Sequence, residues 1–324
     1  MERKKRVNGF FKSVKIELYK NWQLYVLLIL PVAYVIIFSY FPMVGLRIAF
    51  TNHRVAMGMF EAPIHPEGAF HHFRTFLGNP RFWELFNNTI ILSLYGLVIN
   101  SITPLFLALV VNNLVILKLK KTVQMVTYAP HFISAVVMVG ILSQVLGVRS
   151  GFVNNLLFNM GFERINFFAI PQMFRHMFVW SEVWQSNGFR AVIYIAALAG
   201  IDPQLHEAAV VDGASRLRRI WHIDLPGIIP TFMILLILST GGILSNSAPR
   251  VLLFQNPLNI SHSRVIDTYL FERGLGMGIP QGGGAPMPQF AYAAAVGMVQ
   301  SLIGLVMVLS VNKLSRKLTE SGLW

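Results

Sequence analysis

The stretch from residue 178 to residue 244 reads FVWSEVWQSNGFRAVIYIAALAG-IDPQLHEAAVVDGASRLRRIWHIDLP-GIIPTFMILLILSTGGIL. Two apolar blocks, Phe178–Leu198 and Gly227–Leu244, flank a polar link that contains Arg216, Arg218 and Arg219. Crossing about 30 Å of hydrocarbon takes about 20 helical residues, and each block has close to that length. In lipid only helices and closed barrels satisfy every backbone group, and the blocks are too long for barrel strands. The stretch therefore predicts two membrane helices joined by a basic link.

The same pattern continues on both sides of this stretch. Four further apolar blocks are long enough to cross a membrane: Trp22–Phe41, Thr89–Val111, Val123–Leu146 and Ala291–Val311. Of the 324 residues, 54% are hydrophobic and only 13% are charged, whereas a soluble domain of this length needs more polar surface. We therefore expect an all-α, polytopic membrane protein with six transmembrane helices in one domain, residues 22–311.

The distribution of basic residues predicts which side of the membrane each link occupies. The net charge is +13, but the Lys and Arg residues form short clusters between apolar blocks, which argues against a nucleic-acid partner. With the amino terminus inside, the outside loops are longer than the inside links yet contain fewer Lys and Arg residues. The positive-inside rule therefore predicts two cytoplasmic termini. The absence of cysteine excludes disulfides and cysteine-ligated metals and fits a bacterial inner membrane.

Both ends of the chain are predicted to be cytoplasmic segments. Residues 1–21 are rich in Lys and Arg, and apolar residues recur among them at helical spacing: Val7, Phe10, Phe11, Val14 and Leu18. This pattern predicts an amphipathic helix on the inner leaflet, with a solvated basic tail as the alternative. No small-x-small cleavage site follows the first apolar block, so we expect a retained anchor. Residues 312–324 form the predicted carboxy-terminal tail.

The basic link between the blocks of the opening stretch predicts a small helix–turn–helix at the cytoplasmic mouth. Glu207, Ala208 and Ala209 are expected to open a short helix whose small side chains allow close approach to another surface. Gly213 can adopt a positive φ, so the chain can turn there. A second helical stretch then leads to Pro226, which we expect to begin the next span, where a missing amide proton costs little.

This link, about residues 200–226, resembles the "EAA" loop of the permeases of binding-protein-dependent ABC importers. The family motif has Glu-Ala-Ala, three further residues, Gly and, about a dozen residues later, Leu-Pro. The matching residues are Glu207, Ala208, Ala209, Asp212, Gly213, Leu225 and Pro226. The resemblance implies a type I ABC importer permease fold. It also implies that this loop docks on an ATPase subunit and passes its nucleotide-driven movement to the membrane helices.

The resemblance also implies the partners of the chain. These are a second, similar permease, an ATPase dimer and an external solute-binding protein. The chain contains no Walker A pattern, no metal-binding pattern and no convincing catalytic constellation. We therefore expect no enzyme activity, metal or cofactor in this chain, with ATP and Mg bound by the ATPase partner. A secondary transporter is the alternative, which the scarcity of ionisable groups in the spans disfavours.

Segments near the end of the chain resemble a particular branch of this family, the permeases for complex or plant and algal polysaccharides. These segments are Leu253–Pro257, Val265–Tyr269, Asn312–Ser315 and Gly322–Trp324. The leading substrate is an alginate or other uronate oligosaccharide, and the alternative is a neutral plant-polysaccharide oligosaccharide.

Polar side chains within the spans are candidates for a substrate path, because such groups usually face a cavity or a neighbouring helix. Most of the candidates are on the fourth span, and two follow the fifth: Trp180, Glu182, Trp184, Gln185, Asn187 and Arg190, then Ser245 and Asn246. Sugar rings favour aromatic faces and hydrogen-bonding groups, and in the family sugar contacts fall where Ser245 and Asn246 align. Hydrogen bonds between helices are the alternative role for each of these residues. Arg190 and the external Arg250 would suit an acidic sugar.

Overall fold

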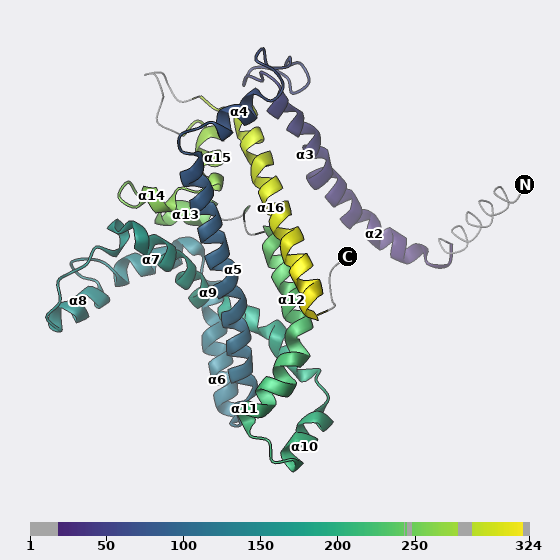
Figure 1. Cartoon of the computed structure of the whole chain (residues 1–324), viewed down its shortest axis with the longest axis vertical. Helices are drawn as coiled ribbons and strands as arrows, with labels where there is room; N and C mark the ends of the chain where they lie inside the picture. Colours follow the sequence, from purple (N-terminus) through teal and green to yellow (C-terminus); the bar gives the residue numbers. More distant parts are fainter. Residues whose placement is uncertain (1–18, 243, 245–247, 278–286, 320–324) are drawn as a thin grey trace, which may run out of the picture.

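The computed structural model describes residues 19–242, 244, 248–277 and 287–319, and these residues form a set of long helices with short helices at both ends (Figure 1). An isolated bridge between Thr51 and Ile64 is the sole β-type pairing in these ranges. The expectation of an all-α fold is confirmed. Residues 1–18, which include most of the predicted amphipathic segment, and residues 320–324 lie outside the described ranges.

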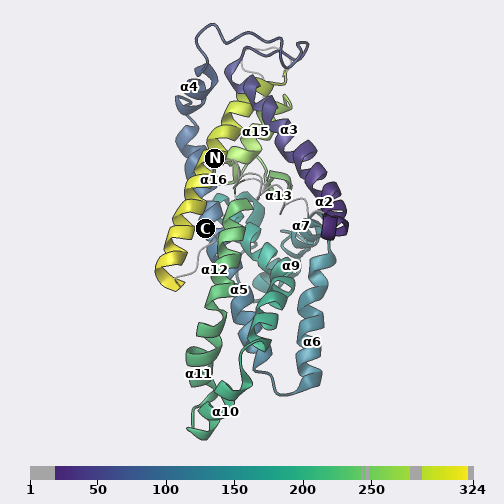
Figure 2. The ribbon, with the colours of Figure 1, turned by 90° about the vertical axis from the view of Figure 1, so that its right-hand side faces the viewer.

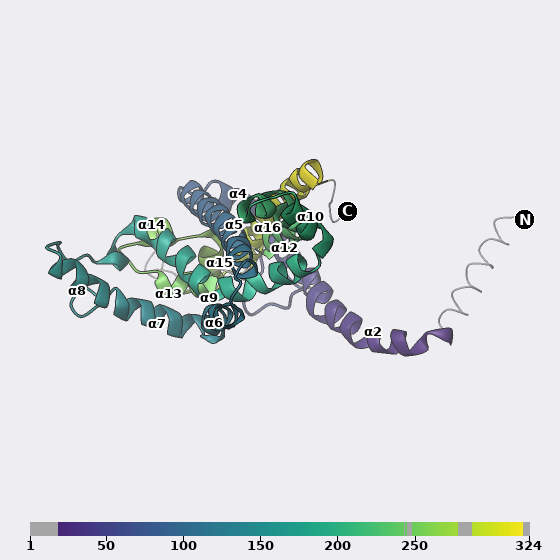
Figure 3. The same ribbon diagram turned by 90° about the horizontal axis from the view of Figure 1, so that it is seen from below.

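The first helical run is longer than the sequence predicts. It comprises α2 (Trp22–Val35), η1 (Ile36–Tyr40), α3 (Phe41–Met43) and η2 (Val44–Phe50), which together make a helix of 29 residues. The predicted end at Phe41 is wrong, because the π-helical turn η1 shifts the hydrogen-bond register just before Pro42, which has no amide proton. The run leans away from the other long helices (Figures 1 and 3). In its most apolar segment, no residue is buried against the described part of the chain.

Helices α5 (Phe82–Asn112) and α9 (Pro171–Ala199) form the centre of the molecule. Together with α12 (Leu225–Gly242) they enclose an apolar cluster of small and large side chains: Ala108, Ala191, Tyr194, Leu198 and Ile228. Gly188 of α9 lies directly against the backbone of Thr127, so α6 (Leu117–Tyr128) approaches α9 closely. Small residues at such crossings are the usual means by which membrane helices pack.

The third predicted span is not one straight helix. It is divided into α6, η3 (Ala129–Phe132) and α7 (Ala135–Val145), with a bend of 105°. Pro130 and Ser134 are the cause: Pro130 has no amide proton for a helical hydrogen bond, and the Ser134 hydroxyl caps a new helix by accepting from the Val137 amide. Helix α7 and the following α8 (Phe152–Asn159) extend sideways from the centre (Figures 1 and 3).

The last long helices, α12 and α16 (Phe290–Thr319), pack side by side (Figure 2). Helix α12 continues upstream through η5 (Ile220–Asp224) and α11 (Arg216–Arg219), giving a run of 27 residues. Helix α16 continues past residue 311 into the predicted tail, where Asn312 and Ser315 are buried. The shorter helices are α4 (His71–Leu77), η4 (Phe167–Ala169), α10 (Pro203–Val211), α13 (Ala248–Phe254), α14 (Ile260–Ser263) and α15 (Ile266–Gly274).

Four helices of the described chain are long and apolar enough to cross a membrane: Trp22–Phe50, Phe82–Asn112, Arg216–Gly242 and Phe290–Lys317. The bent pair of α6–η3 and α7 is a fifth candidate. Helix α9 has the necessary length but is not among them; it contains six of the polar and aromatic candidates for the substrate path. The six-span count and the orientation of the termini therefore stay predictions.

Candidate substrate cavity and coupling segment

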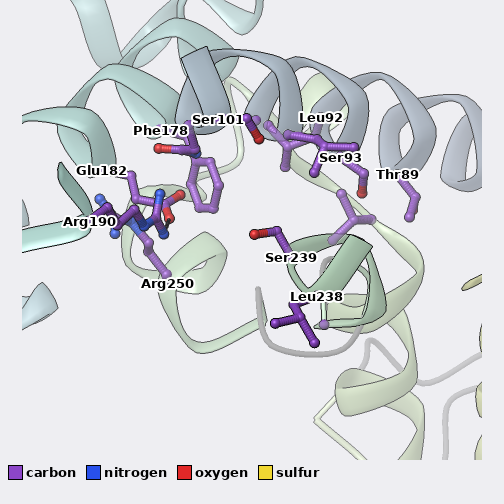
Figure 4. Close-up of a pocket in the computed structure, with 15 residues that line it drawn as sticks. Thr89, Leu92, Ser93, Ser101, Phe178, Glu182, Arg190, Leu238, Ser239 and Arg250 are labelled. Carbon is purple, nitrogen blue, oxygen red and sulfur yellow. Dashed lines mark hydrogen bonds and ion pairs between the residues drawn. The ribbon is translucent and has the colours of Figure 1, made fainter. Parts of the chain in front are cut away.

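A cavity of about 440 Å³ lies between the long helices, within the range of about 300–1,000 Å³ that is typical of ligand pockets. Residues of α5, α9 and α12 form most of its wall, and α13 and the residue before α15 complete it (Figure 4). Besides its apolar residues, the lining contains the polar side chains of Thr89, Ser93, Asn100, Ser101, Glu182, Arg190, Ser239 and Arg250.

Glu182 and Arg190 form an ion pair inside this cavity. An Arg190 guanidinium nitrogen lies 2.6 Å from a Glu182 carboxylate oxygen, and both side chains remain partly exposed to the cavity. The two residues are eight positions apart on α9 and about 80° apart around its axis, and their long side chains meet at the cavity. Figure 4 shows them together with Arg250 at one end of the cavity.

Arg250 of α13 is the second cation at the cavity. Its guanidinium donates to the Gln185 side-chain oxygen at 3.2 Å and to the Ser181 hydroxyl at 3.1 Å, and it lies 5.5 Å from the centre of the Phe178 ring. Its Nε has no hydrogen-bond partner among the described residues. Burial lowers the pKa of the Arg250 guanidinium, which stays charged because the pKa of arginine is normally above 12. Three neutral groups therefore fix the orientation of Arg250, and the Glu182 carboxylate acts on it through charge without a hydrogen bond among the described residues.

The predicted path residues divide between the two sides of α9. Glu182 and Arg190 line the cavity, whereas Trp180 and Trp184 point elsewhere, each about half exposed, and Trp180 donates to the Tyr95 hydroxyl at 2.9 Å. Successive helical residues are about 100° apart, so residues 180 and 182 lie on nearly opposite sides. Neither tryptophan lines this cavity, and their assignment to the substrate path stays a prediction.

The remaining candidates have other positions. Buried Gln185 donates to the Ile133 carbonyl and accepts from Arg250, so it supports the cavity wall from behind. Asn187 does not line the cavity, and its side-chain oxygen is buried without a hydrogen-bond partner in the described part of the chain. Ser245 and Asn246 lie outside the described residues.

Some cavity residues were not selected from the sequence. Thr89, Ser101 and Ser239 line the cavity, but hydroxyl groups within apolar helices give a weak signal because they can bond to their own backbone. Thr89, for example, donates to the Leu85 carbonyl and accepts from the Ile266 amide. Only the packing of α5 against α9 and α12 shows that these residues share one space.

The segment with the Glu-Ala-Ala motif lies at the far end of the molecule from α15 (Figure 1). Helix α10 begins at Pro203, not at Glu207, because the Asp202 carboxylate accepts from the Gln204 amide and proline suits the first helical position. The three motif residues therefore begin at the middle of α10. Glu207 and Ala208 are exposed and Ala209 is half-buried.

Gly213 ends α10 with a positive φ of 75°, as the sequence predicts. The Gly213 amide donates to the Val210 carbonyl at 3.0 Å and the Ala214 amide donates to the Ala209 carbonyl at 2.8 Å. This pair of bonds is the Schellman arrangement, in which glycine is favoured at the left-handed position. The Ser215 hydroxyl then caps α11 at the Arg218 amide.

The Leu225-Pro226 pair lies inside a helix instead of starting one, which corrects the sequence-based expectation. The run begins at Arg216, and the π-helical turn η5 precedes Pro226, with the Leu225 amide donating to the Ile220 carbonyl. The π turn shifts the hydrogen-bond register by one residue next to the proline, and the helical run continues through both. The basic segment and α12 are therefore one continuous element.

A helical chain with a charged cavity between its long helices and an exposed two-helix segment at one end has the features of a transporter's membrane subunit. Residues 91–320 match the family described as "Binding-protein-dependent transport system inner membrane component". The chain therefore belongs to this family, which confirms the resemblance found in the Glu-Ala-Ala segment and disfavours a secondary transporter.

Relatives with known names cover almost the whole chain. The polygalacturonan/rhamnogalacturonan transport system permease protein YteP of Bacillus subtilis (strain 168) is 36% identical, over 97% of this chain and 94% of the relative. Protein LplB of the same organism is 35% identical, over 93% and 91%. A chain from the crystal structure of a bacterial ABC transporter involved in the import of the acidic polysaccharide alginate superimposes with a TM-score of 0.82. It is 32% identical, over 95% of this chain and 99% of that chain.

Proposed function

We propose that this chain is the membrane-spanning permease subunit of an ATP-driven importer for acidic oligosaccharides, with a uronate oligosaccharide such as an alginate fragment as substrate. A second permease, an ATPase dimer that binds ATP and Mg, and an external solute-binding protein complete the importer. A crystal structure of a bacterial alginate ABC transporter in complex with an alginate pentasaccharide-bound periplasmic protein supports this assembly, since a chain in it is 34% identical and superimposes with a TM-score of 0.80.

The observation that carries the substrate class is the charge of the cavity. Two guanidinium groups, Arg190 and Arg250, face a single carboxylate, Glu182, so the lining has an excess of one positive charge. Arg190 is neutralised by Glu182, but Arg250 is held by neutral partners and keeps an unpaired Nε among the described residues. A guanidinium matches the planar fork of a carboxylate, the group that separates uronates from neutral sugars.

The substrates of the relatives agree with this class. Alginate is described as acidic in the crystal structure reported above. Polygalacturonan, which is named for YteP, is by its chemistry also a polyuronate. Neutral oligosaccharides remain the alternative, since an arabinooligosaccharide permease of Bacillus subtilis is 27% identical over 76% of this chain.

The coupling role of the loop rests on its exposure. Helix α10 and the turn at Gly213 present motif residues to the surroundings of the chain, as a docking element requires. A glutamate and small alanine side chains allow another protein surface to approach closely. We infer that an ATPase subunit contacts this surface and that the bilayer surrounds the long helices.

The test is ATP hydrolysis by the complete complex in proteoliposomes, with binding protein that is empty, loaded with alginate oligosaccharides or loaded with neutral oligosaccharides. Stimulation by the uronate alone is expected. Stimulation by the neutral sugar alone would retain the importer and reject the acidic substrate, and stimulation by neither would reject the sugar permease.

A further inference from the structure

Helix α10 is weakly attached to the rest of its own chain. It projects from the lower end of the long helices (Figures 1 and 2), and none of its side chains is buried against the described residues. A short helix is normally held in place by burying an apolar face. The position of α10 must therefore depend on its two ends and on particular side-chain contacts.

One such contact joins α10 to the membrane helix run. The His206 Nε2 lies 3.4 Å from a carboxylate oxygen of Asp224, the last residue of η5. Asp224 is only 2% exposed, and this oxygen has no hydrogen bond within the described ranges. Burying a carboxylate is costly unless a partner compensates its charge. His206 is the one ion-pair partner that the described structure gives to Asp224.

A second contact lies next to the first. A Cβ added to Gly227 would be 2.7 Å from the Ile201 side chain, so Ile201 rests on the backbone of Gly227. Residues 201 and 206 on one side thus face residues 227 and 224 on the other. The two segments run antiparallel, and the contacts are on both sides of the Leu225-Pro226 pair.

We propose that the His206–Asp224 pair positions α10 on the continuous helix Arg216–Gly242, so that a displacement of α10 is passed to α12. This inference rests on the coupling role proposed above for the loop. Moving α10 away from η5 would break both the His206–Asp224 contact and the packing of Ile201 on Gly227, so the two elements are expected to move together. Helix α12 ends at the cavity, where Leu238, Ser239 and Gly242 form part of the lining. His206 and Asp224 are positioning residues; neither lines the cavity.

The first test compares substrate transported per ATP hydrolysed in the reconstituted complex for Asp224→Asn, His206→Gln and the double variant. Each single change is expected to lower this ratio about fivefold, a typical effect of a mutation on coupling between sites. The double variant is expected to be no worse than either single variant, because both changes remove the same interaction. His222→Gln is the matched control, since the His222 ring lies 2.9 Å from the Arg218 carbonyl and has no hydrogen bond or ion pair to α10 in the described part of the chain.

If the complex with His206→Gln does not assemble, Asp224→Asn still tests the proposal. Asp224→Asn breaks the pair and leaves no buried carboxylate without a partner. A ratio within about twofold of the unmodified complex in Asp224→Asn would overturn the proposal, since a coupling of that size is below the usual range. Additive losses in the double variant would overturn it as well.

The second test measures movement directly. The chain contains no cysteine, so spin labels can be placed at Gln204→Cys on α10 and Ile234→Cys on α12. Both positions are exposed. One narrow distance distribution is expected with and without ATP, and a broad one in Asp224→Asn. A distance that changes with ATP in the otherwise unmodified complex would overturn the proposal.

Glu207→Lys separates this inference from the proposed function. If Glu207→Lys lowers the ratio but Asp224→Asn and His206→Gln do not, the loop couples and the pair plays no part in it. If Glu207→Lys also has no effect, the proposed coupling role itself fails.

Discussion

The Glu182 carboxylate lies 2.6 Å from the Arg190 guanidinium, and this ion pair faces the cavity instead of being enclosed between helices. Glu182 therefore occupies the place at Arg190 that a substrate carboxylate would otherwise take. The nearby Arg250 has no such internal counter-ion in hydrogen-bond contact among the described residues. Arg190 and Arg250 therefore differ in their hydrogen-bonded partners, and each gives a separate prediction.

Glu182→Gln is expected to lower both the KM for uronate-loaded binding protein and the maximal uptake rate. The change leaves Arg190 without a counter-ion, so an anionic substrate is held more tightly in the cavity and released more slowly. When the substrate-bound state is stabilised more than the transition state for release, turnover falls. We expect the KM and the maximal uptake rate each to fall about threefold to tenfold. Initial uptake rates in proteoliposomes give both values.

Glu163→Gln is the control, because Glu163 is exposed on the loop after α8, far from the cavity lining. An unchanged KM and uptake rate in a stable Glu182→Gln complex would contradict the role given to this pair.

Arg250→Gln is expected to reduce uronate uptake at least about tenfold, because hydrogen bonds to charged groups contribute about 1.5–3 kcal/mol. Arg250→Lys keeps the charge but lacks the planar fork, so we expect an intermediate rate. Arg149→Gln removes an exposed arginine of the loop between α7 and α8 and serves as the control. Equal rates in Arg250→Gln and Arg149→Gln would exclude Arg250 from substrate binding.

Gly188→Ala is expected to lower the thermal stability of the complex in detergent. A Cβ at this position would be 2.1 Å from the Thr127 carbonyl oxygen, so α9 and α6 would have to separate. Overpacking of this kind costs about 1–3 kcal/mol. The melting temperature measured by tryptophan fluorescence gives the effect. Gly140→Ala in α7, where nothing lies within 4 Å of the added Cβ, is expected to leave the melting temperature unchanged or raise it.

Gly213→Ala is expected to lower transport per ATP, whereas Gly213→Asn is expected to retain more of it. No atom lies within 4 Å of a Cβ at this position, so space is not the limit. The cost is conformational: a positive φ costs about 1–2 kcal/mol for most residues, and asparagine tolerates it better. Equal ratios for the two variants would show that the left-handed turn does not matter for coupling.

The helices and the turn at Gly213 could be predicted from the sequence because their causes are local. Long apolar blocks become helices in lipid whatever surrounds them. The family motif is equally local, since glycine is favoured where the chain takes a positive φ. The ends of the helices were less predictable. The π-helical turns η1 and η5 precede Pro42 and Pro226, and the helices continue beyond these prolines. A change of hydrogen-bond register has no clear sequence pattern from which to predict it.

The composition of the cavity was decided by tertiary structure. From the sequence, the polar residues of α9 could be placed on one helix, but Glu182 and Arg190, which line the cavity, could not be separated from Trp180 and Trp184, which do not. Arg250 is 60 residues after Arg190 in the sequence but lines the same cavity, because its guanidinium is hydrogen-bonded to Ser181 and Gln185 of α9. Helical propensity and hydropathy act over a few residues, whereas the direction in which a polar side chain faces depends on which distant helix packs against it.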